Sequence, residues 1–445
     1  MARFPAQFDP PCQQMGGTVA EGVPRMIRSS HGFRVAALAG AVALALTACS
    51  SDSETSAGET SGSSGGSGDA LVIGTLLPQT GTLAFLGPPE IAGVNLAVNE
   101  INEAGGVLGK DVVVEHADSS DADHAEVATQ SVTDLIGKDV QVIIGAAASA
   151  VTRNVVDDIT NAEIVQISPA NTATDLSGRD PFYFRTAPSD LLQGASLGNL
   201  ILNDGHQNVA AIVFNEDYGT SLRDVLQDTV ESAGGTITYG AAGQEFDPTE
   251  QNFNTIVSSA MATNPDAIAI IAFAQTKLIV PELVAQGFDT SKLYFVDGNL
   301  ADYSADFAPG TLTGAQGTTP GAYPDDEFKA RLLEEDSGLK DFTYGPESYD
   351  ATILAALAAV KGGATDGPTI QKNLAAVSGA NGGTEVTTFA EGVKELEAGN
   401  EIAYKAVSGA GPFNDTNDPS SAFIGIFQYG EDNTYKWIKA EFGEL

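Results

Sequence analysis

The chain has 445 residues, and 59 Asp and Glu side chains stand against 21 Lys and Arg, which gives a formal net charge of −38. This balance excludes a nucleic-acid-binding protein, because phosphate contacts need clustered cationic side chains. It also argues against attachment through anionic lipid headgroups. Two cysteines exclude a disulfide-stapled scaffold and a cysteine-rich zinc site, and four histidines leave few candidates for histidine catalysis.

The amino-terminal stretch has the features of a secretory signal. Basic residues precede an apolar run at 35–46, which is shorter than the ~20 residues of a membrane-spanning helix. We therefore expect residues 1–48 to be a signal peptide. Residues 1–25 have no signal character of their own, and a start at Met26 would make them an extension of the true sequence.

The next stretch, 49–69, begins with Cys49 and continues with Ser, Gly, Thr, Asp and Glu. This composition predicts a flexible tether. A tether of this length would reach roughly 25 Å root-mean-square.

From residue 70 on, short apolar strands alternate with helical segments. Strands are expected at 71–77, 111–117, 141–145, 163–168, 182–187, 208–214, 236–240, 266–273 and 292–297. Helices are expected between them, ending near 103 and spanning 124–136, 149–160, 218–233, 250–262 and 276–286. Near-continuous apolar strands separated by helices predict an α/β fold with parallel sheets covered on both faces.

Shared landmarks suggest two lobes of one design. The sequence Ala-Gly-Gly closes the first helix of one half at 104–106 and of the other at 233–235. Chance repetition of these common residues is the alternative. Later in the chain the pattern changes to helices at 327–339, 347–362 and 371–377, followed by a hairpin of 423–427 and 435–438. Late helices without matching strands fit a chain that returns to cover the first lobe.

Ordered segments of the chain resemble one known family. They are VIGTLLPQTGTLAFLG (72–87), GVNLAVNEINEAGGVLGKDVVV (93–114), VIIGAAASAVT (142–152), VQISPANTATDLS (165–177) and FRTAPSD (184–190). Together they resemble the type I periplasmic solute-binding proteins, in the leucine/isoleucine/valine-binding branch of ABC importers. The likeness covers essentially all of 70–445, and the ordered set is specific where single pieces are weak.

The resemblance implies two α/β lobes, each a mostly parallel sheet flanked by helices, joined by three hinge crossings and closing on a ligand. The crossings would lie near 187–189, 319–321 and 410–413. Lobe 1 would then comprise 70–188 and 321–411, and lobe 2 would comprise 189–320 and 412–445.

The segment Leu46-Thr47-Ala48-Cys49 resembles the lipobox of bacterial lipoproteins. In such proteins the signal is removed before the cysteine, which then carries the lipid. The resemblance implies that Cys49 is the lipidated first residue of the mature chain, held at the extracytoplasmic face of the cell membrane. An ordinary cleaved signal with an incidental cysteine is the alternative.

An amino-acid ligand needs a partner for its carboxylate, and a helix N-terminus supplies one. Ser149 stands where a strand ends and a helix opens, so it can offer a hydroxyl and a nearby N–H. The alternative is that Ser149 is only an N-cap. The resemblance implies that Ser149, the backbone at Ala170 and the hydroxyl of Thr172 hold the polar end of the ligand, rather than forming a plain turn.

The ligand's ammonium needs a carboxylate. Asp297 ends the strand at 292–297, at the edge of the sheet where α/β ligand sites form. The resemblance implies that an acid here receives the ammonium, although glutamate is usual and Asp297 is shorter; a structural strand-end acid is the alternative. Tyr218 would pack on the ligand, and its ring face would attract the ammonium.

Two further residues are expected either to line the same cleft or to pack in the core. Phe273 ends the third strand of the second lobe, and Leu86 stands where many relatives have an aromatic residue. The chain also departs from the family at Ala148, which occupies a position expected for a cysteine of the first-lobe disulfide.

The sequence supports an enzyme or a metal-binding protein less well than it supports a solute-binding protein. The string Gly-Ala-Ser-Leu-Gly at 194–198 matches a nucleophile elbow, but an elbow follows a strand, and this string lies inside an expected helix. Asp118, Asp121, Asp123 and His124 lack the spacing of a calcium loop, so a solvated loop is expected. We therefore expect neither an enzyme nor a metal or cofactor site.

The expected function is that of an extracytoplasmic substrate-binding lipoprotein of an ABC importer. It would capture an amino acid, branched-chain or otherwise aliphatic, and deliver it as a monomer to a membrane permease with its ATPase subunits. The alternatives are a membrane-tethered ligand sensor for a signalling partner, or a binder of amides, urea-like molecules or small aromatic acids.

Overall fold

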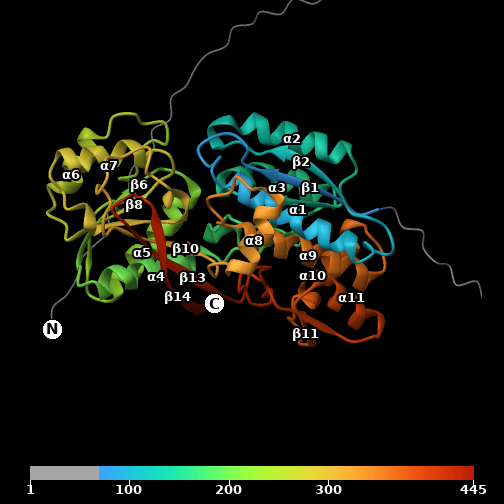
Figure 1. Ribbon diagram of the computed structural model, residues 1–445. Coiled ribbons are helices and arrows are strands. Elements are labelled where there is room, and N and C mark those ends of the chain that lie inside the picture. Colours follow the sequence, from blue (N-terminus) through green and yellow to red (C-terminus); the bar gives the residue numbers. More distant parts are fainter. Residues whose placement is uncertain (1–69) are drawn as a thin grey trace, which may run out of the picture. The chain divides into compact units, whose positions relative to one another are not determined.

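The computed structural model describes residues 70–445. Two β-sheets flanked by helices form two lobes within this part of the chain, as Figure 1 shows, and the expected α/β fold is confirmed. The expected signal at 1–48, the tether at 49–69 and the lipidated Cys49 lie outside the described residues. No helix within 70–445 has both the length and the apolar character needed to span a bilayer.

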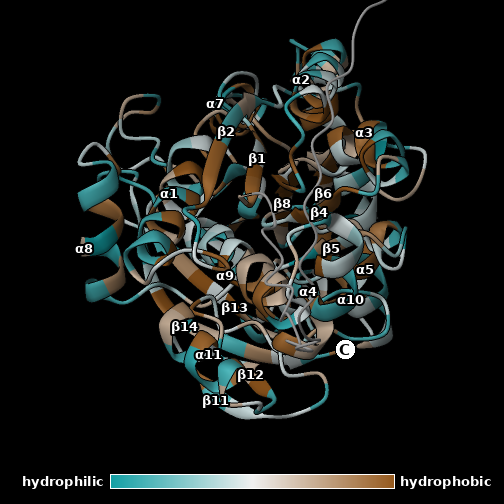
Figure 2. Ribbon diagram, turned by 90° about the vertical axis from the view of Figure 1, so that its right-hand side faces the viewer, coloured by the Kyte–Doolittle hydropathy of each residue, from teal (hydrophilic) through white to brown (hydrophobic). Residues whose placement is uncertain are grey.

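The sheet of the first lobe has five parallel strands in the order β2-β1-β3-β4-β5. Its strands and helices are β1 (Val72–Leu77), α1 (Gly87–Glu103), β2 (Val113–Asp118), α2 (Ala125–Gly137), β3 (Val142–Gly145), α3 (Ser149–Asn161), β4 (Val165–Ser168) and β5 (Tyr183–Arg185). All residues of β3 and β4 are buried, because helices cover both faces of the sheet. Figure 2 shows hydrophobic strands in the interior, surrounded by helices that carry both hydrophilic and hydrophobic residues.

The sheet of the second lobe has seven strands in the order β14-β13-β10-β9-β8-β6-β7. Its elements are α4 (Asp190–Asn203), β6 (Asn208–Val213), α5 (Asp217–Ser232), β7 (Thr236–Tyr239), α6 (Asn254–Met261), β8 (Ala267–Ile271), α7 (Thr276–Ala285), β9 (Leu293–Phe295), β10 (Gln316–Pro320), β13 (Ser421–Tyr429) and β14 (Tyr435–Glu444). β13 pairs antiparallel with β10 and β14, which confirms the closing hairpin, and the other pairs are parallel.

The late helices complete the first lobe, as expected. They are α8 (Asp326–Glu335), α9 (Gly345–Gly362), α10 (Gly367–Val377) and α11 (Phe389–Glu397), with the small sheet of β11 (Thr384–Val386) and β12 (Ile402–Tyr404). α9 packs against α1, α10, β3 and β4, and its residues are buried as far as Ala359. A Cβ on Gly93 of α1 would lie 2.2 Å from the carbonyl oxygen of Gly345, so only glycine permits this close packing.

The chain passes between the lobes after β5, between β10 and α8, and between β12 and β13. The boundaries expected at 188, 320 and 411 stay predictions within these connections.

A buried ion pair ties β5 to the segment before β13. The guanidinium of Arg185 donates to both carboxylate oxygens of Asp418, at 2.7 Å each, and also to the carbonyl of Ala173 and the hydroxyl of Ser177. The side chains are 0% and 3% exposed. Because the guanidinium is fully buried, loss of the Asp418 carboxylate would leave a buried, partly unsatisfied charge.

We expect Asp418→Ala to lower the free energy of unfolding by about 3–5 kcal/mol, the range for breaking a buried ion pair. Urea denaturation measures this change. The control is Asp157→Ala, which breaks the pair with Arg179 where the Asp157 side chain is 65% exposed, and which should cost less than about 1 kcal/mol. Equal effects of the two variants would contradict the importance of the buried pair.

Candidate functional site

All seven residues predicted to contact a ligand lie around one small cavity between the lobes. Its lining residues are Leu83, Leu86, Ala147, Ala148, Ser149, Ala170, Asn171, Thr172, Tyr218, Phe273, Asp297, Gly298 and Tyr344. The cavity measures about 20 Å³, which is on the scale of a single water molecule. Residues from both lobes therefore meet at this point with little free space between them.

The first-lobe side of the cavity is the start of α3. Ser149 is the first helical residue and Ala148 is the N-cap, with no side-chain capping bond, so the alternative of Ser149 as N-cap is wrong. The hydroxyl of Ser149 is buried and accepts a hydrogen bond from the N–H of Ala173 at 3.3 Å. Since the first N–H groups of a helix have no partner within it, this end of α3 can receive an anion.

The loop after β4 is fixed by its own hydrogen bonds. The hydroxyl of Ser168 donates to the carbonyl of Ala146 at 2.7 Å and accepts from the N–H of Asn171 at 3.1 Å. The amide of Asn171 donates to the same carbonyl at 3.1 Å. Ala170 and Thr172 are thereby held beside Ser149, and the hydroxyl of Thr172 is buried.

On the opposite side, Asp297 follows β9 in a short 3-10 turn. Its Oδ1 accepts from the hydroxyl of Tyr218 at 2.6 Å and from Nε2 of Gln193 at 2.7 Å, and its Oδ2 accepts from the hydroxyl of Tyr344 at 2.6 Å. Burial raises the pKa of Asp297, whereas these three donors lower it. A carboxylate has about four acceptor positions, so Asp297 can still accept from a further donor.

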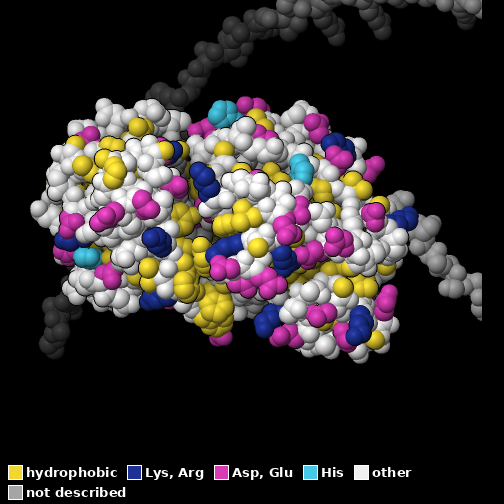
Figure 3. Space-filling view, in the orientation of Figure 1, with side chains coloured by type: hydrophobic (Ala, Val, Ile, Leu, Met, Phe, Trp, Pro, Cys, Tyr) yellow, Lys and Arg dark blue, Asp and Glu magenta, His cyan; other side chains and the backbone are white. Residues whose placement is uncertain are grey.

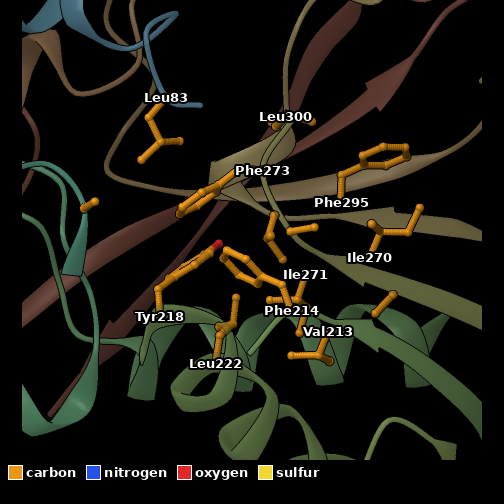
Figure 4. Close-up of a cluster of buried hydrophobic side chains, with 14 of the residues drawn as sticks. Leu83, Val213, Phe214, Tyr218, Leu222, Ile270, Ile271, Phe273, Phe295 and Leu300 are labelled. Carbon is orange, nitrogen blue, oxygen red and sulfur yellow. The ribbon is translucent and has the colours of Figure 1, made fainter. Parts of the chain in front are cut away.

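Aromatic and aliphatic side chains form the remaining wall. The rings of Tyr218 and Phe273 stack with their centroids 5.6 Å apart and their planes 14° apart. Phe214 packs edge-on against Phe273, at 4.7 Å and 70°. Figure 4 shows this aromatic cluster with Leu83 across from it. Phe273 and Leu86, at 8% and 2% exposed, both line the cavity and belong to the surrounding hydrophobic core.

Three residues close to this site are absent from the sequence prediction. Tyr344 comes from the segment before α9 and has a left-handed φ of 61°, which is unusual for an aromatic residue. Gln193 is a fully buried polar residue of α4, and the sequence alone does not indicate that it is buried. Glu216, the N-cap of α5, is the third, and a Glu just before a helix is a capping signal that sequence reading can detect.

Glu216 joins the two lobes. Its carboxylate accepts from the N–H of Tyr218 at 2.7 Å in its own helix and from the N–H of Ala150 in α3 at 3.1 Å. Beside it, Nε of Arg153 in α3 donates to Asp217 in α5 at 2.6 Å. We call these contacts between the starts of α3 and α5 the interlobe latch.

A family model described as "Periplasmic binding protein" matches residues 70–397. The chain belongs to the periplasmic binding protein family. The chemotactic signal transduction system substrate-binding protein BasB of Halobacterium salinarum is similar to this binding protein, with 27% identity over 80% of the chain and 86% of the relative. The Leu/Ile/Val-binding protein BraC3 of Rhizobium johnstonii is 28% identical over 44% of the chain, a match that spans only 53% of that relative.

Solved structures agree with the type I fold of this binding protein. The leucine-binding protein LivK of Thermotoga maritima has a TM-score of 0.69 at 20% identity, over 83% of this chain and 98% of its own. The protein LivJ of Streptococcus pneumoniae, solved with isoleucine, has a TM-score of 0.68 at 22% identity, over 85% and 100%. These two structures confirm the expected type I fold.

The motif Gly-Ala-Ser-Leu-Gly of this binding protein lies inside α4, as expected, and is no nucleophile elbow. The hydroxyl of Ser196 donates to Glu441 at 3.2 Å. A Cβ on Gly194 would lie 2.7 Å from the side chain of Val225, and one on Gly198 would lie 2.8 Å from that of Thr229. The glycines therefore permit close packing of α4 on α5.

The acidic loop at 118–124 is held by hydrogen bonds. Asp121 accepts from Nδ1 of His124 at 2.7 Å and from the N–H of Thr82 at 2.9 Å. Within 70–445, no three His, Cys, Asp or Glu side chains are grouped so that they could hold a metal ion.

Two acids make stability depend on pH, namely the fully buried Asp190 and the half-buried Glu216. Burial raises the pKa of Glu216 and of Asp190 to about 7, from ordinary values near 4. Between those values the folded protein binds more protons than the unfolded chain, so the free energy of unfolding falls as pH rises from about 4.5 through 7. We expect Glu216→Gln to flatten this fall, measured by urea denaturation between pH 5 and 8.

The control for this measurement is Glu334→Gln, which changes an exposed acid of α8. It should leave the pH dependence unaltered. A wild-type protein whose stability rises over the same interval would contradict the raised pKa values of Glu216 and Asp190.

Proposed function

We propose that this chain is an extracytoplasmic substrate-binding lipoprotein of an ABC importer, which captures an amino acid by hinged closure and delivers it to a membrane permease with its ATPase subunits. One observation carries the proposal. The start of α3, which suits an anion, and Asp297, which suits a cation, face one cavity from opposite lobes. Only a ligand with both charges satisfies both sides.

In the proposed complex the ligand's carboxylate lies at Ser149 and the first turn of α3. The backbone of Ala170 and the hydroxyl of Thr172 hold the same polar end. The ammonium reaches Asp297, which lines the cavity together with Tyr218.

The side chain of the ligand would rest against Leu86 and Phe273. This apolar wall favours branched-chain and other aliphatic amino acids, because it offers burial and no further hydrogen-bonding group. Relatives of the same fold have been solved with isoleucine, with Leu and with 4-hydroxybenzoate. Small aromatic acids are therefore the second class of ligand to test.

The size of the cavity supports a hinged mechanism. A space of about 20 Å³ does not admit an amino acid, so entry requires the lobes to part. Parting separates α3 from α5 and breaks the interlobe latch, where Glu216 holds Ala150 and Arg153 holds Asp217. Closure on a ligand would bring the starts of α3 and α5 toward each other again.

A ligand sensor for a signalling partner is the second candidate function. The observation in its favour is the similarity to BasB, a substrate-binding protein of a chemotactic signal transduction system. Cells that lack the chain should lose uptake of labelled amino acid if it serves an importer. They should keep uptake and lose the swimming response if it serves a sensor.

We expect isothermal titration of residues 70–445 to show saturable binding of leucine, isoleucine or valine. Asp297→Asn and Ser149→Ala should each weaken that binding by at least about 1.5 kcal/mol, the lower range for a hydrogen bond to a charged group. Ser196→Ala, in the interior of α4, is the control and should bind as the wild type does. Unchanged affinity of Asp297→Asn would remove Asp297 from the site.

The lipid anchor is tested separately on the full chain expressed in its own host. Wild type should sediment with membranes and release an amino-terminal lipopeptide that begins at Cys49, as detected by mass spectrometry. Cys49→Ser should move the protein to the soluble fraction, because a lipidated cysteine holds the chain by buried acyl groups. An unmodified cysteine in the mature wild type would contradict the anchor.

A further inference from the structure

A second, much larger cavity lies beside the first and has no part in the proposed function. It measures about 720 Å³ and shares Phe273, Gly298 and Tyr344 with the small cavity. Its walls come from the loop 81–89 and the connection 336–347 of the first lobe, and from the second lobe across the cleft. A cavity of this size matches those that hold drug-sized organic molecules.

Charge is arranged unevenly in this cavity. Asp302, Asp336 and Lys340 are exposed at its rim, and Lys277 forms an ion pair with Asp306 at 3.1 Å. Half-buried Asp341 also lines the cavity and accepts from the hydroxyl of Tyr435 at 2.8 Å. The remaining acid, Glu347, lies at the floor and is 2% exposed. Within residues 70–445, no Lys or Arg forms an ion pair with it.

A second buried acid stands behind the first. Glu90 of α1 is 0% exposed, and neither of its carboxylate oxygens has a hydrogen-bond partner within the described chain. Burial raises the pKa of both carboxyl groups, and the negative charge of Glu347 raises that of Glu90 further. Two adjacent buried acids without a counter-cation are costly when ionised, and a bound cation at Glu347 would relieve that cost.

The floor also offers a hydroxyl. Thr319 lines the cavity at 6% exposed, and its Oγ1 has no hydrogen-bond partner within the described residues. Two residues on, Gly321 leaves room for the acid, because a Cβ there would lie 2.0 Å from Oε1 of Glu347. A buried, unsatisfied hydroxyl and a buried carboxylate together suit a donor with several N–H groups.

The walls between rim and floor are aromatic. They include Phe85, Tyr303, Phe342, Phe427 and Tyr435. Such rings bury apolar carbon and attract cations to their faces. This wall already receives one cation of the protein, since Nζ of Lys329 lies 4.0 Å from the centre of the ring of Tyr323 at the rim.

We propose that the large cavity binds a primary amine with an apolar body, whose ammonium group lies against Glu347 and Thr319. Among the described residues that line this cavity, the basic ones, Lys277 and Lys340, are exposed, so the interior near Glu347 offers no basic side chain to the carboxylate of an amino acid. The ammonium position at Glu347 is separate from the amino-acid site, although the two cavities share Phe273, Gly298 and Tyr344 and lie between the same two lobes. Its occupant would add contacts across the cleft and favour the closed arrangement.

The experiment uses phenethylamine as the probe and phenethyl alcohol as its neutral counterpart, with residues 70–445. Titration calorimetry should show saturable binding of the amine and at least 10-fold weaker binding of the alcohol. The single tryptophan of the chain, Trp437, stacks on Tyr323 at 6.1 Å and 18°, so its fluorescence gives a second readout near the rim.

Glu347→Gln should weaken amine binding at least 10-fold, and Thr319→Val should weaken it to a smaller extent. Asp302→Asn, which neutralises a rim acid, is the matched control and should change affinity less than 3-fold. Glu347→Gln is expected to fold, because it replaces a buried carboxyl by a neutral group of the same size. A thermal melt checks folding, and the amine should raise the melting temperature of the wild type and of Asp302→Asn by similar amounts, and that of Glu347→Gln by much less.

Equal binding of the alcohol and the amine, or full affinity in Glu347→Gln, would overturn the proposal. So would the lack of any heat or fluorescence change with the amine. Leucine is titrated into the same proteins in parallel. Loss of leucine binding with intact amine binding would count against the amino-acid site alone, and the converse would count against the amine site alone.

Discussion

Parallel strands all end at the same edge of their sheet, and in this protein the carboxyl-terminal edges of two sheets face each other. Ser149 follows β3, Ala170 follows β4, Phe273 follows β8 and Asp297 follows β9. Their meeting in one place is therefore a consequence of strand order, not of closeness in the sequence. The same edge-to-edge arrangement brings the starts of α3 and α5 together, and it also leaves the larger cavity beside them.

The interior between the lobes is rich in acids and poor in bases. Asp297 is satisfied by two tyrosines and a glutamine, and Glu216 by two backbone N–H groups. Neutral donors of this kind hold a carboxylate in place without cancelling its charge. On the outer surface too, acidic side chains are more frequent than basic ones, as Figure 3 shows for one face. Such a molecule attracts cationic groups both at a distance and at the point of contact.

Much of the fold follows from the apolar pattern of the sequence. The buried strands β3, β6 and β8 are short apolar runs between helices, and they form where the pattern predicts. The apolar pattern does not predict β10, because its sequence Gln-Gly-Thr-Thr-Pro has almost no apolar residue. The position of β10 in the sheet is set instead by its pairing with β9 and β13 on either side. The boundaries of the helix expected at 250–262 also shift, since α6 starts only at Asn254.

The residues of the site also fall into two groups, those that the sequence predicts and those that it does not. Residues at strand ends could be predicted, because their position in an α/β repeat fixes where they lie. Tyr344 could not, since it reaches Asp297 only through the return of the chain to the first lobe. Gln193 lies in the first turn of α4, and only the packing of α4 on β10 reveals that it faces inward, toward Asp297 and the carbonyl of Thr318.

The position of α9 late in the chain has a consequence for folding during synthesis. This helix fills the space between α1 and strands β3 and β4, yet it follows nearly the whole second lobe in the chain. A ribosome must therefore release the second lobe's parallel strands before the first lobe can complete its core. Until then the apolar face of α1 lacks its cover, so the first lobe stays incompletely packed while the second lobe is being synthesised.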